Sequence, residues 1–154
     1  MEILLFKTLW GHEGSIAEAV NLAQEAGFNG IEGMYPDDPA EQEEFRAALA
    51  EGGMNFIAEV STATTPGLYV PMPGKSPTEH VESLRAGIEK SLPAEPLFIN
   101  TMCGSDAWSE AEAAEFYGAI PGLETEYGIS ISAETHRGRY INSPWHTRFV
   151  LTEV

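Results

Sequence analysis

Short apolar runs alternate with longer polar stretches along the whole chain, and this alternation limits the folds that the sequence can form. The polar stretches are rich in Ala and Glu and are long enough for helices of several turns. Strands that alternate with helices favour a parallel sheet with right-handed crossovers. The sequence therefore predicts an α/β protein with five strands, which we expect at residues 3–7, 29–34, 55–60, 97–102 and 129–135.

Small oxygen-bearing side chains mark the positions where we expect the helices to begin. In most cases a Glu follows three residues later, which is the capping-box pattern, or a proline occupies the first helical position. The five predicted starts are Ser15 with Glu18, Asp38-Pro39 with Glu41, Ser76-Pro77 with Glu79, Ser109 with Glu112, and Ser143-Pro144. Glycines mark the helix ends, because they adopt the left-handed conformation that closes a helix. They are Gly27, Gly52-Gly53 and Gly128.

Two architectures accommodate five strand–helix units. An open, flavodoxin-like doubly wound sheet is complete at about 150 residues, whereas a (β/α)8 TIM barrel needs about 250. The turn at residues 9–15 lacks the pattern of a phosphate-binding loop, which disfavours the open sheet. The chain also stops just inside the helix that begins at Ser143. We therefore expect residues 1–154 to form one truncated domain, the first five units of a TIM barrel, with the open sheet as the alternative.

Polar side chains recur near the ends of the expected strands. Glu32, Glu59 and Glu134 each lie at or near the end of a strand that follows a glycine, and Asn100 lies in the fourth strand. The C-terminal ends of parallel strands build the active site in α/β folds. These four residues are therefore candidates for a functional site.

The last expected strand carries a second group of candidates. A period of two sends Ile131 and Ala133 to one face and Glu134 and His136 to the other. Arg137 and Arg139 follow directly, in a chain with only 8 Lys and Arg against 24 Asp and Glu. Because basic residues are so few in this chain, the two guanidinium groups beside a carboxylate and an imidazole predict binding of a phosphate or carboxylate.

Charge and composition exclude several classes of function. The formal net charge of -16 opposes binding to phosphate backbones, so nucleic acid is not an expected partner. No stretch reaches the length of a membrane span, and the first residues are too acidic for a secretory signal, so we expect a cytoplasmic protein without a membrane partner. We expect the single Cys103 to be a small buried side chain, and we expect His80, on the third helix, to lie at the surface.

Two segments resemble a known family. They are the Gly-Phe-Asn-Gly-Ile-Glu phrase that ends at Glu32, and Glu134-Thr-His-Arg-Gly-Arg139, which is followed by Asn142-Ser-Pro-Trp. Both resemble the xylose-isomerase-like TIM-barrel superfamily of sugar and sugar phosphate isomerases and epimerases, over the whole chain as its first five units. The resemblance implies the N-terminal part of a metal-dependent sugar or sugar phosphate isomerase or epimerase, which moves a proton beside a carbonyl.

The resemblance also implies roles for single residues. Glu134 would be a ligand of a divalent metal (Mn, Mg, Co or Zn) and would act with His136 in catalysis. The implied substrate-binding residues are Trp10, His12, Glu32, Glu59, Asn100, Arg137 and Arg139. One carboxylate cannot hold a catalytic metal. We therefore expect that this chain does not bind the metal stably and is inactive by itself.

Other functions stay open. The chain is also compatible with a noncatalytic half-barrel that self-associates through open sheet edges, or with a dehydratase of the same superfamily. The expected partners are a small sugar or sugar phosphate and a second copy of the chain. By this resemblance a full-length protein would be an isomerase or epimerase, whereas the 154 residues are expected to be inactive by themselves.

Overall fold

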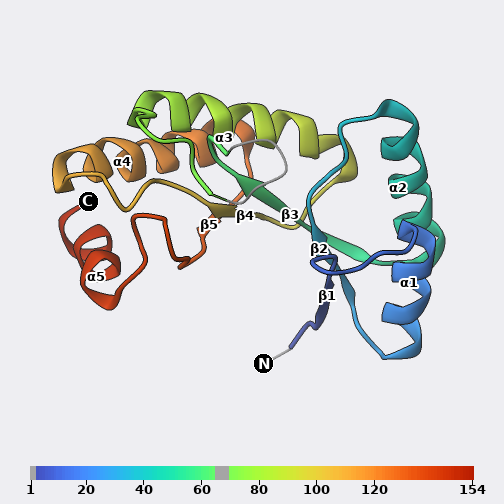
Figure 1. Ribbon diagram of the computed structural model, residues 1–154. Coiled ribbons are helices and arrows are strands. Elements are labelled where there is room, and N and C mark those ends of the chain that lie inside the picture. Colours follow the sequence, from blue (N-terminus) through green and yellow to red (C-terminus); the bar gives the residue numbers. More distant parts are fainter. Residues whose placement is uncertain (1–2, 65–69) are drawn as a thin grey trace. The chain divides into compact units, whose positions relative to one another are not determined.

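Strands and helices alternate in the computed structural model, which describes residues 3–64 and 70–154 (Figure 1). The predicted α/β class is confirmed. The elements are β1 (Phe6–Thr8), α1 (Ile16–Glu25), β2 (Gly30–Gly33), α2 (Pro39–Gly52), β3 (Asn55–Ser61), α3 (Pro77–Ser91), the 3-10 turn η1 (Leu92–Ala94), β4 (Ile99–Met102), α4 (Glu110–Tyr127), β5 (Ile131–Ala133) and α5 (Pro144–Glu153).

The strands form one five-stranded sheet in the order β1-β2-β3-β4-β5. β2 pairs in parallel with both β1 and β3, with Glu32 opposite Thr8 on one side and Ile57 on the other. A flavodoxin-like sheet reverses its strand order, whereas consecutive strands of a barrel are neighbours throughout. The observed order therefore favours the barrel-type arrangement over the open doubly wound alternative.

The strand boundaries differ from the prediction mainly at the two edges of the sheet. β1 was expected at residues 3–7 but begins at Phe6, and β5 was expected at 129–135 but covers Ile131–Ala133. An edge strand has a neighbour on one side only, so fewer of its residues complete a ladder of hydrogen bonds. The apolar residues before β1 are exposed, with Ile3 at 68% and Leu5 at 52%.

The five predicted helix starts are confirmed by hydrogen bonds of the capping side chains. Ser15 and Ser109 form complete capping boxes with Glu18 and Glu112. Asp38, Ser76 and Ser143 accept from backbone amides of the first turns of α2, α3 and α5. At the C-terminal ends, Gly53 and Gly128 have φ of 59° and 65°, the left-handed conformation expected of closing glycines. Within the described part of the chain, no helix combines the length and the apolar character needed to cross a membrane.

The chain divides into two compact units whose boundaries fall inside β3, near the C-terminal end of α3 and inside β4. Unit 1 comprises Met1–Glu59 and Lys90–Ile99. Its helices α1 and α2 pack on each other, and α1 packs on β2. Tyr35, Phe45 and Phe56 form its aromatic core, with ring centroids 5.4 Å apart for Tyr35 and Phe45 and 5.0 Å apart for Phe45 and Phe56. This core lies between helix and sheet, because Phe45 belongs to α2 and Phe56 belongs to β3.

Unit 2 comprises Val60–Glu89 and Asn100–Val154. Its core is aromatic as well: Trp108 and Phe116 are buried, and their ring centroids lie 5.6 Å apart. Leu84 and Ile88 of α3 are also fully buried. The last two residues of β3, most of β4 and all of β5 belong to this unit, so it holds the predicted candidates in β4 and after β5.

Candidate functional site

Asn100 and Glu134 lie on neighbouring strands of unit 2 and contact each other. Asn100 is the second residue of β4, and Glu134 directly follows β5. Asn100 Nδ2 donates to Glu134 Oε2 over 3.1 Å, and the Glu134 amide donates to the carbonyl of Thr101 over 2.9 Å. Both side chains are half-buried. An ionised carboxylate offers about four acceptor positions, so Glu134 keeps capacity for a ligand.

His136 and Arg137 follow in the loop after β5. His136 Nδ1 lies 2.7 Å from the carbonyl oxygen of Arg137. A carbonyl oxygen only accepts, so Nδ1 is the donor in this contact. His136 is half-buried and Arg137 is exposed. Their predicted roles in catalysis and in substrate binding stay predictions.

Arg139 has a structural contact that the sequence did not indicate. Its side chain is fully buried. Nη1 donates to the carbonyl of Thr62 over 2.9 Å and to that of Gly104 over 3.4 Å. Burial lowers the pKa of the Arg139 guanidinium from its usual value. Its predicted role in anion binding stays a prediction, whereas its observed role is to tie together the segments that follow β3 and β4.

His80 is fully buried, so the expectation that it lies at the surface is wrong. His80 shares the buried face of α3 with Leu84 and Ile88, and the spacing of four residues was the sequence signal for this. His80 Nδ1 lies 2.6 Å from Thr62 Oγ1, and the ring packs edge-on against Trp108. Burial and, to a smaller extent, the positive charge of Arg139 lower the pKa of His80 to about 4.

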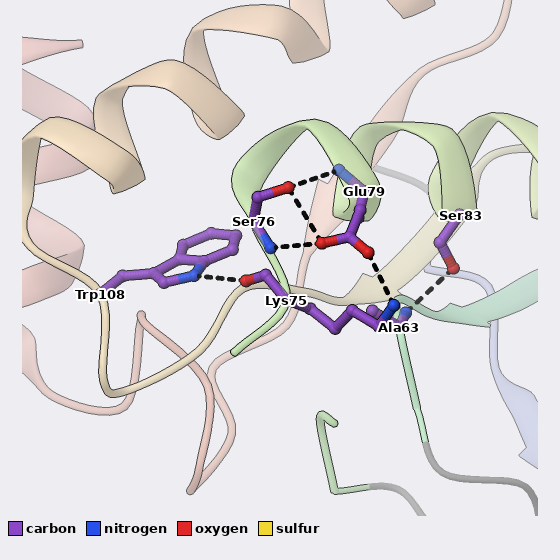
Figure 2. Close-up of polar contacts among 6 residues, drawn as sticks. All are labelled: Ala63, Lys75, Ser76, Glu79, Ser83 and Trp108. Carbon is purple, nitrogen blue, oxygen red and sulfur yellow. Dashed lines mark hydrogen bonds and ion pairs between the residues drawn. The ribbon is translucent and has the colours of Figure 1, made fainter. Parts of the chain in front are cut away.

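Lys75 and Ser76, which directly precede α3, are held by polar contacts (Figure 2). The Glu79 carboxylate accepts from the Ser76 amide over 2.9 Å and pairs with Lys75 Nζ over 2.6 Å. Trp108 Nε1 donates to the Lys75 carbonyl over 3.2 Å. Hydrogen bonds from Lys75 and then Ser76 lower the pKa of Glu79 to about 2. The loops that precede α3 and α4 are therefore joined within unit 2, where loops after parallel strands commonly carry function.

Glu32 and Glu59 belong to unit 1 and lie on one face of two paired strands. Glu32 is opposite Ile57 in the parallel register, and Glu59 lies two residues farther along β3. Because side chains alternate with a period of two, both carboxylates point to the same side of the sheet. Both are half-buried. Ligand binding by this pair stays a prediction.

Trp10 and His12 lie in the loop between β1 and α1 of unit 1. The Trp10 side chain is 72% exposed. His12 Nε2 lies 3.1 Å from the carbonyl oxygen of Ser15 at the start of α1. An exposed indole is accessible for stacking on a ligand, but no described contact tests this role.

The expected divalent metal has a single predicted ligand in this chain, Glu134. Among residues 3–64 and 70–154, no three His, Cys, Asp or Glu side chains lie in positions that could together hold a metal ion. The side-chain partner of Glu134 is the amide of Asn100. This donor set does not fit a catalytic metal, which needs three or more ligands, and we derive no step through one.

Comparisons with known proteins identify the fold. No protein-family model and no curated protein matches the chain. Among solved structures, it is similar to the carboxyl transferase domain of Rhizobium etli pyruvate carboxylase with 3-bromopyruvate, at 16% identity and a TM-score of 0.62, over 96% of this chain and 24% of that chain. The same domain with pyruvate and biocytin matches at 17% identity and a TM-score of 0.58, over 86% and 23%. A Rhizobium etli pyruvate carboxylase variant crystallised without acetyl coenzyme-A matches at 16% and 0.63, over 97% and 15%.

These similarities correct the predicted family. The chain spans about a quarter or less of its structural neighbours, and they are carboxyl transferase domains, TIM barrels of a different superfamily from the xylose-isomerase-like proteins. The predicted membership and the predicted sugar isomerase or epimerase activity are therefore wrong, and the dehydratase alternative of that superfamily is wrong with them. The physical reason is that a glycine, an apolar strand and a carboxylate at its end recur in parallel barrels generally and do not specify one chemistry.

Proposed function

We propose that unit 2 binds a small, hydroxyl-bearing metabolite, with Asn100 and Glu134 as the hydrogen-bonding groups. The observation that carries the proposal is the 3.1 Å contact between Asn100 Nδ2 and Glu134 Oε2 on neighbouring strands. This contact holds the two side chains in one arrangement before a ligand arrives, which reduces the entropy that binding costs. In parallel α/β folds, ligands bind at the C-terminal ends of the strands, and Glu134 directly follows β5.

Charge selects the class of ligand. A carboxylate or phosphate placed against Glu134 would be repelled, and the net charge of -16 adds to this repulsion. A sugar hydroxyl, in contrast, donates to the carboxylate and accepts from an amide. A neutral sugar or polyol therefore suits Asn100 and Glu134. The phosphate of a sugar phosphate would have to lie away from Glu134, toward the exposed Arg137.

A 2-oxo acid is the second candidate ligand. The structural neighbours were determined with 3-bromopyruvate and with pyruvate and biocytin, which favours this class. The carboxylate of a 2-oxo acid suits the exposed guanidinium of Arg137, and its carbonyl suits a donor such as Asn100. This candidate concerns binding only, because the chain covers 24% of the carboxyl transferase domain.

Calorimetric titration of the full chain with a monosaccharide panel, a polyol and pyruvate tests both candidates. We expect Glu134→Gln to weaken binding of the neutral ligand by about 10-fold, the usual effect of losing a charged hydrogen bond. Glu82→Gln, which changes an exposed carboxylate on α3 of the same unit, is the matched control and should leave binding unchanged. Pyruvate binding that Arg137→Gln abolishes would select the second candidate. Absence of binding by the full chain to all of these ligands would overturn the proposal.

We also propose that the protein works in the cytoplasm. Its single cysteine, Cys103, is free and buried, as expected for a protein of a reducing compartment. Fractionation of the producing cells would test this location, and recovery of the protein outside the cytoplasm would contradict it.

A further inference from the structure

A cavity of about 340 Å³ lies within unit 1, where the loops that follow β1 and β2 meet the start of α1 and the first two turns of α2. The two helices pack on each other in this unit (Figure 1). This volume is at the lower end of the range of about 300 to 1,000 Å³ that is usual for small-molecule sites. No residue of the cavity belongs to the Asn100 and Glu134 pair, so the cavity is a separate candidate for ligand binding.

Apolar side chains make up half of the cavity lining. They come from both loops and both helices and are Leu9, Ile16, Met34, Pro36 and Phe45. Phe45 is only 4% exposed and belongs to the aromatic core of the unit, so this wall is rigid, whereas Met34 is 44% exposed. A rigid aromatic wall beside an adaptable methionine suits the apolar part of a ligand.

Two carboxylates supply the charge of the cavity. Glu41 and Glu44 lie three residues apart on α2, and positions with this spacing share one face of a helix. Both are exposed, and none of the ion pairs among the described residues involves either of them. His12 is the remaining ionisable lining residue, and the lining contains no Lys or Arg. The charge of the cavity is therefore negative and uncompensated by its own walls.

We infer that this cavity binds a small organic cation with an apolar body, such as a primary amine on an aromatic or aliphatic group. The ammonium group would pair with Glu41 and Glu44, and the apolar body would pack between Leu9, Met34 and Phe45. Negative charge opposes an anionic ligand, and the apolar wall disfavours a strongly hydrated inorganic cation.

Benzylamine is a suitable probe, with benzyl alcohol and phenylacetate as neutral and anionic analogues of similar size. Titration of the ¹⁵N-labelled full chain at low salt should shift the amide signals of the cavity residues with benzylamine and not with phenylacetate. The double variant Glu41→Gln/Glu44→Gln should weaken benzylamine binding by about 10-fold or more, because it removes both charges from the site. Glu51→Gln, which changes an exposed carboxylate of the same helix outside the cavity, is the matched control.

Three outcomes would overturn the inference. They are equal binding of benzylamine and benzyl alcohol, unchanged binding by the double variant, or an equal loss in the Glu51→Gln control, which would indicate attraction by net charge alone. Thermal unfolding of each variant checks that the fold is retained. The cavity lies in unit 1, whereas Asn100 and Glu134 lie in unit 2. Failure of this inference would therefore not affect the proposal for Asn100 and Glu134, which has its own experiment.

Discussion

Thr62 Oγ1 and His80 Nδ1 lie 2.6 Å apart and join the residue that follows β3 to the first half of α3. The contact is buried, and the backbone carbonyl of the same Thr62 accepts a hydrogen bond from Arg139. One threonine thus links a strand end, a helix and the loop after β5 within unit 2. The stability of this unit should depend on these contacts, because each of the polar groups involved is removed from water.

Stability should fall as the pH drops below the ordinary pKa of histidine. The pKa of His80 is about 4 in the folded chain, against a usual value of 6.5. The unfolded state therefore binds more protons between these two values, and the free energy of unfolding decreases as the pH falls through that window. The full effect is about 3 kcal/mol, reached below pH 4. Urea unfolding between pH 7.5 and 4 measures it, with His80→Phe as reference because carboxylates also titrate there. Equal pH dependence of the two proteins would contradict this prediction.

Replacing Arg139 should destabilise the fold more than replacing the exposed Arg137. Arg139→Ala leaves the buried carbonyls of Thr62 and Gly104 without this donor, and each unsatisfied group costs about 1–3 kcal/mol. Arg137→Ala should change the free energy of unfolding by less than about 0.5 kcal/mol, since its side chain is exposed. Urea denaturation at pH 7.5 measures both values. Equal effects of the two substitutions would show that the buried contacts are not important for stability.

Cys103 should be unreactive in the folded chain. Its side chain is fully buried, and burial raises the pKa of the thiol to about 11, so the reactive thiolate is scarce at pH 8. Ellman's reagent at pH 8 should label the native protein slowly and label one thiol at once in 6 M guanidinium chloride. Rapid labelling of the native protein would contradict the buried position.

The chain should associate with a second copy through β1. This strand lies at the edge of the sheet, and Leu5 next to it is 52% exposed. An edge strand with unpaired backbone groups and apolar neighbours favours pairing between chains. Sedimentation velocity should show a dimer that Leu5→Lys weakens, whereas Lys7→Arg, which keeps the charge, serves as the control. A monomer at all concentrations would rule this association out.

Helix starts could be predicted from the sequence because a cap is a local interaction. Ser15 and Glu18, or Ser109 and Glu112, bond across three residues of the same chain segment, so their pattern is readable without any knowledge of distant residues. The edge strands were placed less accurately, because the length of β1 depends on pairing with β2, which no local pattern encodes.

Two of the candidate residues named from the sequence, Asn100 and Glu134, contact each other in the structure, and their role in a site stays a prediction. The family was predicted wrongly, because the sequence motifs around Glu32 and Glu134 reflect strand–helix geometry that many barrels share. The cavity with Glu41 and Glu44 was missed, since a cavity is a product of packing between two loops and two helices.

The order of the strands and helices, the α/β class and the helix starts were determined by the sequence alone, because periodicity and capping act over a few residues. The tertiary structure decided which polar groups are buried and which of them meet. Arg139 is charged and lies beside the exposed Arg137, yet it is buried because carbonyl oxygens from two distant segments accept its hydrogen bonds. Such partners lie 35 and 77 residues away along the chain, so only the packed fold brings them together.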